Sequence, residues 1–175
     1  PLVPVGFFVN GVEVGKTAIG DNWVYISNSR TLMLTSSGPY VLSGVATNDN
    51  VKVDVIWPGA TIVLSNAVAS ERPVVNANQS TTILMAGGTS YLASKVESSA
   101  ITIGENMSLR IGLAPGADSS EAMVEVFNDG GASAIGESGS ASVAVDGGTL
   151  FAWSDKQAAG VSPNAFSCGA NEGMM

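Results

Sequence analysis

The residues of this chain that could do chemistry are carboxylates and aromatic rings, because the usual catalytic and metal-binding side chains are scarce. The 175 residues include no histidine and a single cysteine, Cys168. Without histidine there is no imidazole general base and no Ser-His-Asp or Cys-His arrangement. One thiol and no imidazole also cannot supply the usual ligands of a structural zinc site. An enzyme would have to work through carboxylates alone, so we expect a protein that is not an enzyme.

The acidic residues are concentrated in the second half of the chain. Residues 1–95 have balanced charges, so residues 96–175 carry the whole net charge of −8. Oxygen ligands of this kind suit calcium, and two carboxylates at the right separation could hydrolyse a glycosidic bond. No calcium-loop motif is present, and solvated acidic turns are the plainer interpretation, so no cofactor is expected and calcium is the alternative, with Asp118, Glu121 and Asp129 as its candidate ligands. These three belong to a wider group around an expected loop and the next corner: Asp118, Glu121, Glu125, Asp129 and Asp146.

Aromatic residues recur when the chain is aligned with itself. Residues 82–94 match a later segment at a constant offset of 60, which places Tyr91 on Phe151. Val63 joins the same column at an offset of 28, and Trp153 lies at another register. We expect such a column to lie in the core. The alternative is an exposed platform on which sugar rings stack, with Tyr91, Phe151 and Trp153 as its candidate residues.

The elements that must position these residues are short strands. Residues 99–101 recur at 133–135, an offset of 34. The interval between the two copies contains a Gly-Leu-Ala-Pro-Gly stretch that predicts an inserted loop. Apolar residues alternate in segments too short to be stable alone, and Gly-rich turns separate them. Stacked repeats would bury a continuous core. We therefore predict an all-β fold, a parallel β-solenoid (β-helix) of about 4–5 coils, with a β-sandwich as the alternative.

The alternation also predicts which side chains point inward. In a strand, every second residue faces the same side. Six residues in three equivalent segments are therefore expected in the core: Ile83, Met85, Leu109, Ile111, Val143 and Val145.

The N-terminal segment lies outside the repeat. Asn10-Gly11 between alternating residues is typical of a β-hairpin with a type I′ turn. We interpret residues 1–27 as a hairpin cap or docking segment and residues 28–175 as the solenoid domain. An open strand edge invites pairing with another chain, and the two halves of the chain differ in charge. We therefore expect a head-to-tail homo-oligomer or a neighbouring domain, contacted through Phe7, Phe8, Val9 and Val12.

Two groups of motifs resemble known families. Gly-Ala-Ser-Ala-Ile-Gly (131–136) and Ser-Val-Ala-Val-Asp-Gly-Gly-Thr-Leu (142–150) resemble a repeat of bacterial surface β-helix proteins. Tyr-Val-Leu-Ser-Gly (40–44), with the strand-like segments after it, resembles the bacterial carbohydrate-binding β-helix domain family. The resemblance spans about residues 40–162. It implies a pectate-lyase-like solenoid that binds plant polysaccharide, with calcium in its fold.

Together these patterns favour an extracellular or cell-surface module with a structural or adhesive role, which could be a subunit of a head-to-tail fibre. The alternative is a carbohydrate-binding module for a polysaccharide, and a polysaccharide lyase or hydrolase comes after both. The net charge of −8 disfavours nucleic acid as a partner. The sequence contains no run of about 18 apolar residues, so no membrane span is predicted.

Overall fold

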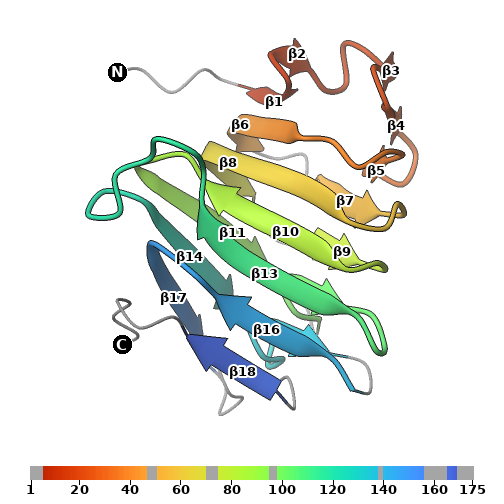
Figure 1. The fold of residues 1–175 in the computed structure, drawn as a ribbon. Helices are drawn as coiled ribbons and strands as arrows, with labels where there is room; N and C mark the ends of the chain where they lie inside the picture. The colour runs from red at the N-terminus through yellow and green to blue at the C-terminus, as the bar shows by residue number, and fades with distance from the viewer. Residues whose placement is uncertain are drawn as a thin grey trace.

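The structure, a computed structural model, is built of β-strands and turns. It describes residues 6–46, 51–69, 75–94, 98–137, 140–155 and 165–168, and no helix occurs within those ranges. The strands of these residues form two sheets, one with 11 strands and one with seven (Figure 1). The all-β class expected from the sequence is therefore confirmed.

The 11-stranded sheet divides into two ladders at its longest strand, β8 (Ala60–Ala69). Residues 60–64 of β8 pair with β10, whereas Val68 and Ala69 pair with β11. Both ladders continue in parallel, and β6 pairs in parallel along β8 on its other side. The first ladder contains β10 (Thr81–Met85), β13 (Ser108–Leu113), β16 (Ser142–Val145) and β18 (Ala165–Cys168), the second contains β11 (Thr89–Ser94), β14 (Met123–Asn128) and β17 (Thr149–Ser154), and the sheet also includes β1 (Gly6–Val9), β2 (Val12–Glu13) and β6 (Tyr40–Ala46).

The seven-stranded sheet is parallel at one end and antiparallel at the other. Its strands follow the order β15, β12, β9, β7, β5, β4, β3. Pairing is parallel from β15 to β5 and antiparallel from β5 to β3. The strands are β3 (Ile19–Gly20), β4 (Trp23–Ile26), β5 (Thr31–Leu34), β7 (Lys52–Val55), β9 (Val75–Ala77), β12 (Ile101–Ile103) and β15 (Ile135–Glu137).

The predicted parallel β-solenoid of about 4–5 coils is wrong. The described strands form two mixed sheets, in which β1 pairs antiparallel with β2 and β6, and β4 pairs antiparallel with β3 and β5. The reason lies in the N-terminal turns. The chain reverses within two residues at Asn10-Gly11 and again at Asp21-Asn22, and such tight turns join antiparallel strands only. The repeat detected further along the chain does not extend to this region.

The interior lies between the sheets and follows the alternation of the strands. All six side chains predicted to be in the core are at most 3% exposed. Burying each of them contributes about 1.5–3 kcal/mol relative to leaving it in water. This part of the prediction is confirmed, and it explains why strands of only four to six residues hold together in β10, β13 and β16.

The register of the ladders agrees with the sequence alignment in one ladder and differs in the other. Tyr91 pairs with Glu125 and Glu125 with Phe151, which gives the expected offset of 60. In the first ladder Ile83 pairs with Ile111 and Ile111 with Val145, an offset of 62. An error of two residues leaves every side chain on its own face of the strand, so the buried set is still correct. The loop predicted at an insertion lies between β13 and β14.

The N-terminal hairpin is present and packs on the same chain. Asn10 and Gly11 have φ angles of 51° and 80°, as a type I′ turn requires. β1 pairs with β6, and the side chains of Phe7 and Val9 are buried in the core. Phe8 is half-buried, and Val12 is exposed. Phe7 and Val9 therefore pack into the core of their own chain, and association of the chain stays a prediction.

The expected division after residue 27 falls between β4 and β5, which pair with each other in one sheet. Residues 1–5 of the predicted docking segment and residues 169–175 at the other end of the chain lie outside the described residues.

Candidate functional site

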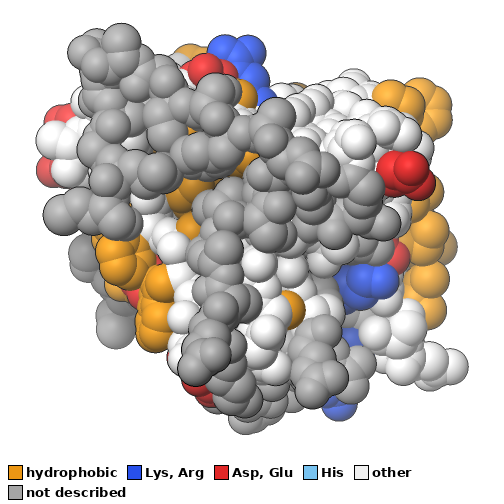
Figure 2. All heavy atoms as spheres, turned by 90° about the horizontal axis from the view of Figure 1, so that it is seen from below, with side chains coloured by type: hydrophobic (Ala, Val, Ile, Leu, Met, Phe, Trp, Pro, Cys, Tyr) orange, Lys and Arg blue, Asp and Glu red, His pale blue; other side chains and the backbone are white. Residues whose placement is uncertain are grey.

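Aromatic side chains gather on the outward side of the second ladder. Burial alternates along β11, β14 and β17, so nine side chains of these strands point away from the core. Four of them are aromatic, and we call the surface around them the aromatic face, defined by Tyr91, Phe127, Phe151, Trp153 and the carboxylate of Glu125. Figure 2 shows hydrophobic side chains at its left margin, on the side where β14 and β17 lie in Figure 1. The nine outward residues are Thr89, Tyr91, Ala93, Met123, Glu125, Phe127, Thr149, Phe151 and Trp153.

Three of the four rings of the aromatic face are open to solvent, and Phe127 is half-buried. Tyr91 is 43% exposed, and Phe151 and Trp153 are each 38% exposed. The expectation that Tyr91 and Phe151 form a core column with Val63 is therefore wrong. Val63 lies in the other ladder, where it pairs with Leu84, and Val68 is the β8 residue that pairs with Tyr91. Tyr91, Phe151 and Trp153 therefore lie exposed on the same side of one ladder, as the alternative interpretation of an exposed platform expected.

The position of the indole ring of Trp153 is set by two contacts. The ring stacks on Phe127 with centroids 3.8 Å apart and planes 25° apart. Its Nε1–H donates a hydrogen bond of 3.0 Å to Oε1 of Glu125. This close stacking and the satisfied indole N–H both hold the ring in place. The exposed part of the ring therefore lies away from Phe127, in an orientation that is already established without a ligand.

The two partners of Trp153 were not recognised from the sequence. Glu125 was grouped with the acidic loop, and Phe127 was not singled out. A signal was available, because the offset of 34 found between residues 101 and 135 also relates Tyr91 to Glu125 and Ala93 to Phe127.

A polar corner holds the end of this ladder in place. Asn128 follows the aromatic face and is fully buried. Its Oδ1 accepts hydrogen bonds from the backbone N–H groups of Gly130 and Ala132, and its Nδ2 donates one to the carbonyl of Ser98. Because each bond ties the end of β14 to a turn beside it, the strands under the aromatic face have little freedom to shift.

The carboxylates proposed for calcium are not assembled into a metal site. Among the described residues, no group of three or more His, Cys, Asp or Glu side chains could hold a metal ion. Asp118 is fully exposed and accepts hydrogen bonds from the hydroxyl and the backbone N–H of Ser120, which lower its pKa. Glu121 is exposed on the same loop, and the backbone of Asp129 donates to the carbonyl of Ser94. Asp146 follows β16 on the first ladder, where its backbone N–H donates to the carbonyl of Ile111.

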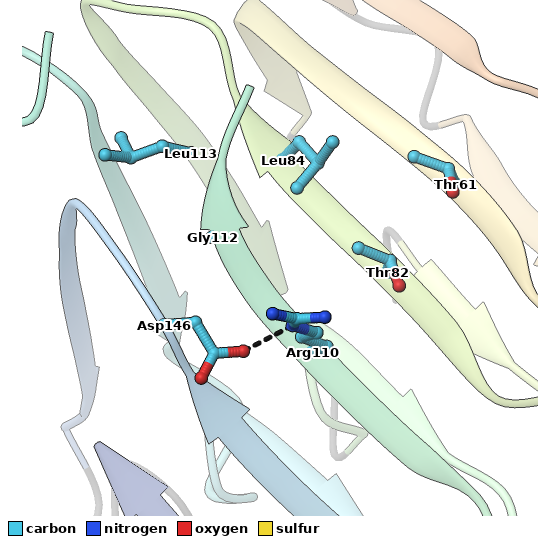
Figure 3. A pocket seen from close by; sticks show the side chains of 7 residues that line it. All are labelled: Thr61, Thr82, Leu84, Arg110, Gly112, Leu113 and Asp146. Carbon is cyan, nitrogen blue, oxygen red and sulfur yellow. Dashed lines mark hydrogen bonds and ion pairs between the residues drawn. The ribbon is translucent and has the colours of Figure 1, made fainter. Parts of the chain in front are cut away.

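The outward side of the first ladder has a different character. Arg110 on β13 forms an ion pair through Nε with Asp146, at the end of β16, as Figure 3 shows. The pair borders an open hollow of about 360 Å³. No aromatic ring lines the hollow, so this surface offers threonine hydroxyl groups, two leucine side chains and one ion pair. The hollow is lined by Thr61, Thr82, Leu84, Arg110, Gly112, Leu113 and Asp146.

The fold and the aromatic face define an all-β protein with exposed aromatic side chains on one side of a ladder. No protein-family model, curated protein or solved structure matches the chain. The described residues include no helix that is long and apolar enough to cross a membrane.

Proposed function

We propose that this chain is a non-catalytic module that binds a polysaccharide on its aromatic face, outside the cell or at its surface. The observation that carries the proposal is the exposure of Tyr91 on β11 and of Phe151 and Trp153 on β17, on the same side of one ladder. Exposed rings at positions set by a sheet can stack against the apolar faces of sugar rings with little loss of side-chain entropy. Isolated surface aromatics are common, whereas a contiguous group of them is typical of a binding surface.

The spacing of the rings suits an extended chain of sugars. Tyr91 and Phe151 are two strands apart in one row, so their backbones are separated by about 10 Å at a strand spacing of about 4.8 Å. That distance is close to the disaccharide repeat of an extended β-1,4-linked polysaccharide. The chain would cross the strands, with one ring at each end of the repeat.

The experiment that tests this proposal is affinity electrophoresis of the protein in gels that contain a series of polysaccharides, followed by titration calorimetry with any that retard it. Trp153→Ala should weaken binding about tenfold, because a stacked ring contributes roughly 1–3 kcal/mol. The matched control is Trp57→Ala, which removes a 50% exposed indole between β7 and β8, off the aromatic face. Equal losses in both variants, or no retardation of the wild type by any polysaccharide, would contradict the proposal. The same incubations should release neither reducing nor unsaturated sugars.

A second candidate function is a structural or adhesive module. It is favoured by a second apolar surface on the outward side of β3 and β4, where Ile19 is 72% exposed and Ile26 is also exposed. Stacking of a sugar on the aromatic face does not need this surface, whereas a subunit that contacts neighbours on two sides would use both. Sedimentation of the wild type and of Ile19→Asp separates the two functions, since only an assembling module would change its mass with concentration and lose that change in the variant.

A further inference from the structure

The aromatic face carries one charge, and it is negative. Of its nine outward side chains, Glu125 alone is charged, and none is Lys or Arg. Glu125 pairs with Tyr91 on one side and Phe151 on the other, so its carboxylate lies in the row between the two exposed rings. A ligand that spans both rings must therefore pass over Glu125.

We infer that the polysaccharide bound here is neutral, and that Glu125 is the residue that selects it over acidic chains. This inference rests on the proposed function. A carboxylate has about four acceptor positions, and Glu125 uses one oxygen to accept the indole N–H of Trp153. Its remaining acceptor capacity faces a surface on which sugar hydroxyls are the natural donors, and hydrogen bonds to a charged acceptor are the stronger kind.

A uronic acid in the same place would bring a second carboxylate against Glu125. Two negative charges about 6 Å apart at a surface, with an effective dielectric constant of about 60, repel each other by about 0.9 kcal/mol. No cation of the aromatic face offsets this repulsion, and the net charge of −8 adds to it at longer range. Selection therefore comes from repulsion of the wrong ligand as well as from attraction of the right one.

The test compares polysaccharides that share a backbone and differ in charge. Hydroxyethyl cellulose and carboxymethyl cellulose form one pair, and methyl-esterified and de-esterified homogalacturonan form another. We expect the wild type to bind the neutral member of a pair about fivefold more tightly at low salt, and the difference to shrink in 1 M NaCl, where the Debye length is about 3 Å.

The variant that tests the residue is Glu125→Gln, which retains an oxygen for the indole N–H and removes the charge. It should lose most of the preference for the neutral member. Glu121→Gln is the matched control, because it makes the same change in net charge on the exposed loop after β13 and should keep the preference.

A wild type that binds both members of a pair equally, or a preference that survives in Glu125→Gln, would overturn the inference while leaving the proposed function intact. Absence of binding to any member of either pair and to every other polysaccharide would overturn both.

Discussion

The two outward faces of the 11-stranded sheet start from the same strand, β8, and cover the same interior, yet they present different chemistry. On β11, β14 and β17 the outward positions carry four aromatic rings around one carboxylate. On β10, β13 and β16 the outward positions carry no aromatic ring, but hydroxyl, aliphatic and small side chains and an ion pair between Arg110 and Asp146. Folding requires the inward residues of both ladders, whereas no packing requirement explains exposed rings on only one of them. The difference therefore points to the aromatic face as the surface with a function.

The largest expected effect tests whether a charge destabilises the protein more at an inward position of a strand than at an outward position. Val143 and Ala144 are neighbours on β16, the first buried and the second facing outward beside Arg110. Val143→Asp should lower the free energy of unfolding by about 4 kcal/mol, because it places an unpaired charge in the core. Ala144→Asp should change it by no more than about 0.5 kcal/mol. Chemical denaturation measures both, and similar losses in the two variants would show that the burial pattern is wrong.

A smaller effect is expected at the turns that connect strands of the first ladder to strands of the second. Gly148 (φ 77°) and Gly116 (φ 82°) both need a backbone conformation that favours glycine. A Cβ on Gly148 would also lie 2.5 Å from Cε of Met85 and 3.0 Å from the carbonyl oxygen of Ala122, while one on Gly116 would meet nothing within 4 Å. Thermal or chemical unfolding should show Gly148→Ala destabilised by about 2–3 kcal/mol and Gly116→Ala by about 1 kcal/mol. Equal values would mean that the turn at Gly148, between β16 and β17, is not packed against the ladder.

The ion pair between Arg110 and Asp146 should contribute little to stability. The side chains of Arg110 and Asp146 are 66% and 40% exposed, and exposed pairs contribute about 0.2–1 kcal/mol, which salt reduces. A double-mutant cycle with Arg110→Gln and Asp146→Asn should give a coupling of about 0.5 kcal/mol that disappears in 1 M NaCl. Neither variant should alter polysaccharide binding. Loss of binding in either variant would show that the binding surface is the outward side of the first ladder and not the aromatic face.

The smallest effect concerns the long loop between the two ladders. The hydroxyl of Ser120, followed by its backbone N–H, lowers the pKa of Asp118, so the ionised form is favoured in the folded state. A pKa below the unfolded value adds stability that is present above the unfolded pKa and is lost as the pH falls through the folded pKa. Ser120→Ala should raise the pKa of Asp118 towards its usual value. Carboxyl chemical shifts in an NMR titration measure this change, and an unchanged pKa would show that the hydroxyl contact is not maintained in solution.

The amino-acid sequence by itself determined the local features of this protein. Period-two alternation identified the six buried residues of β10, β13 and β16, and Asn10-Gly11 identified the hairpin turn, because both depend on neighbours in the chain. The recurrence at an offset of 60 also placed Tyr91 and Phe151 in one row correctly. Even the register error in the first ladder left the buried set unchanged, since a shift of two residues keeps each side chain on the same face.

Tertiary structure alone decided which side of each strand is covered and which strands meet. Alternation separates two faces of a strand but does not say which of them another layer will cover, and aromatic residues suit either environment. Tyr91 and Phe151 were therefore assigned to the core, although their ladder turns them to solvent and brings Glu125 between them. The antiparallel pairing of β1 with β6 was likewise beyond the local pattern, because it joins Phe7 to Gly44, a contact between residues far apart in the chain that no repeat or turn records.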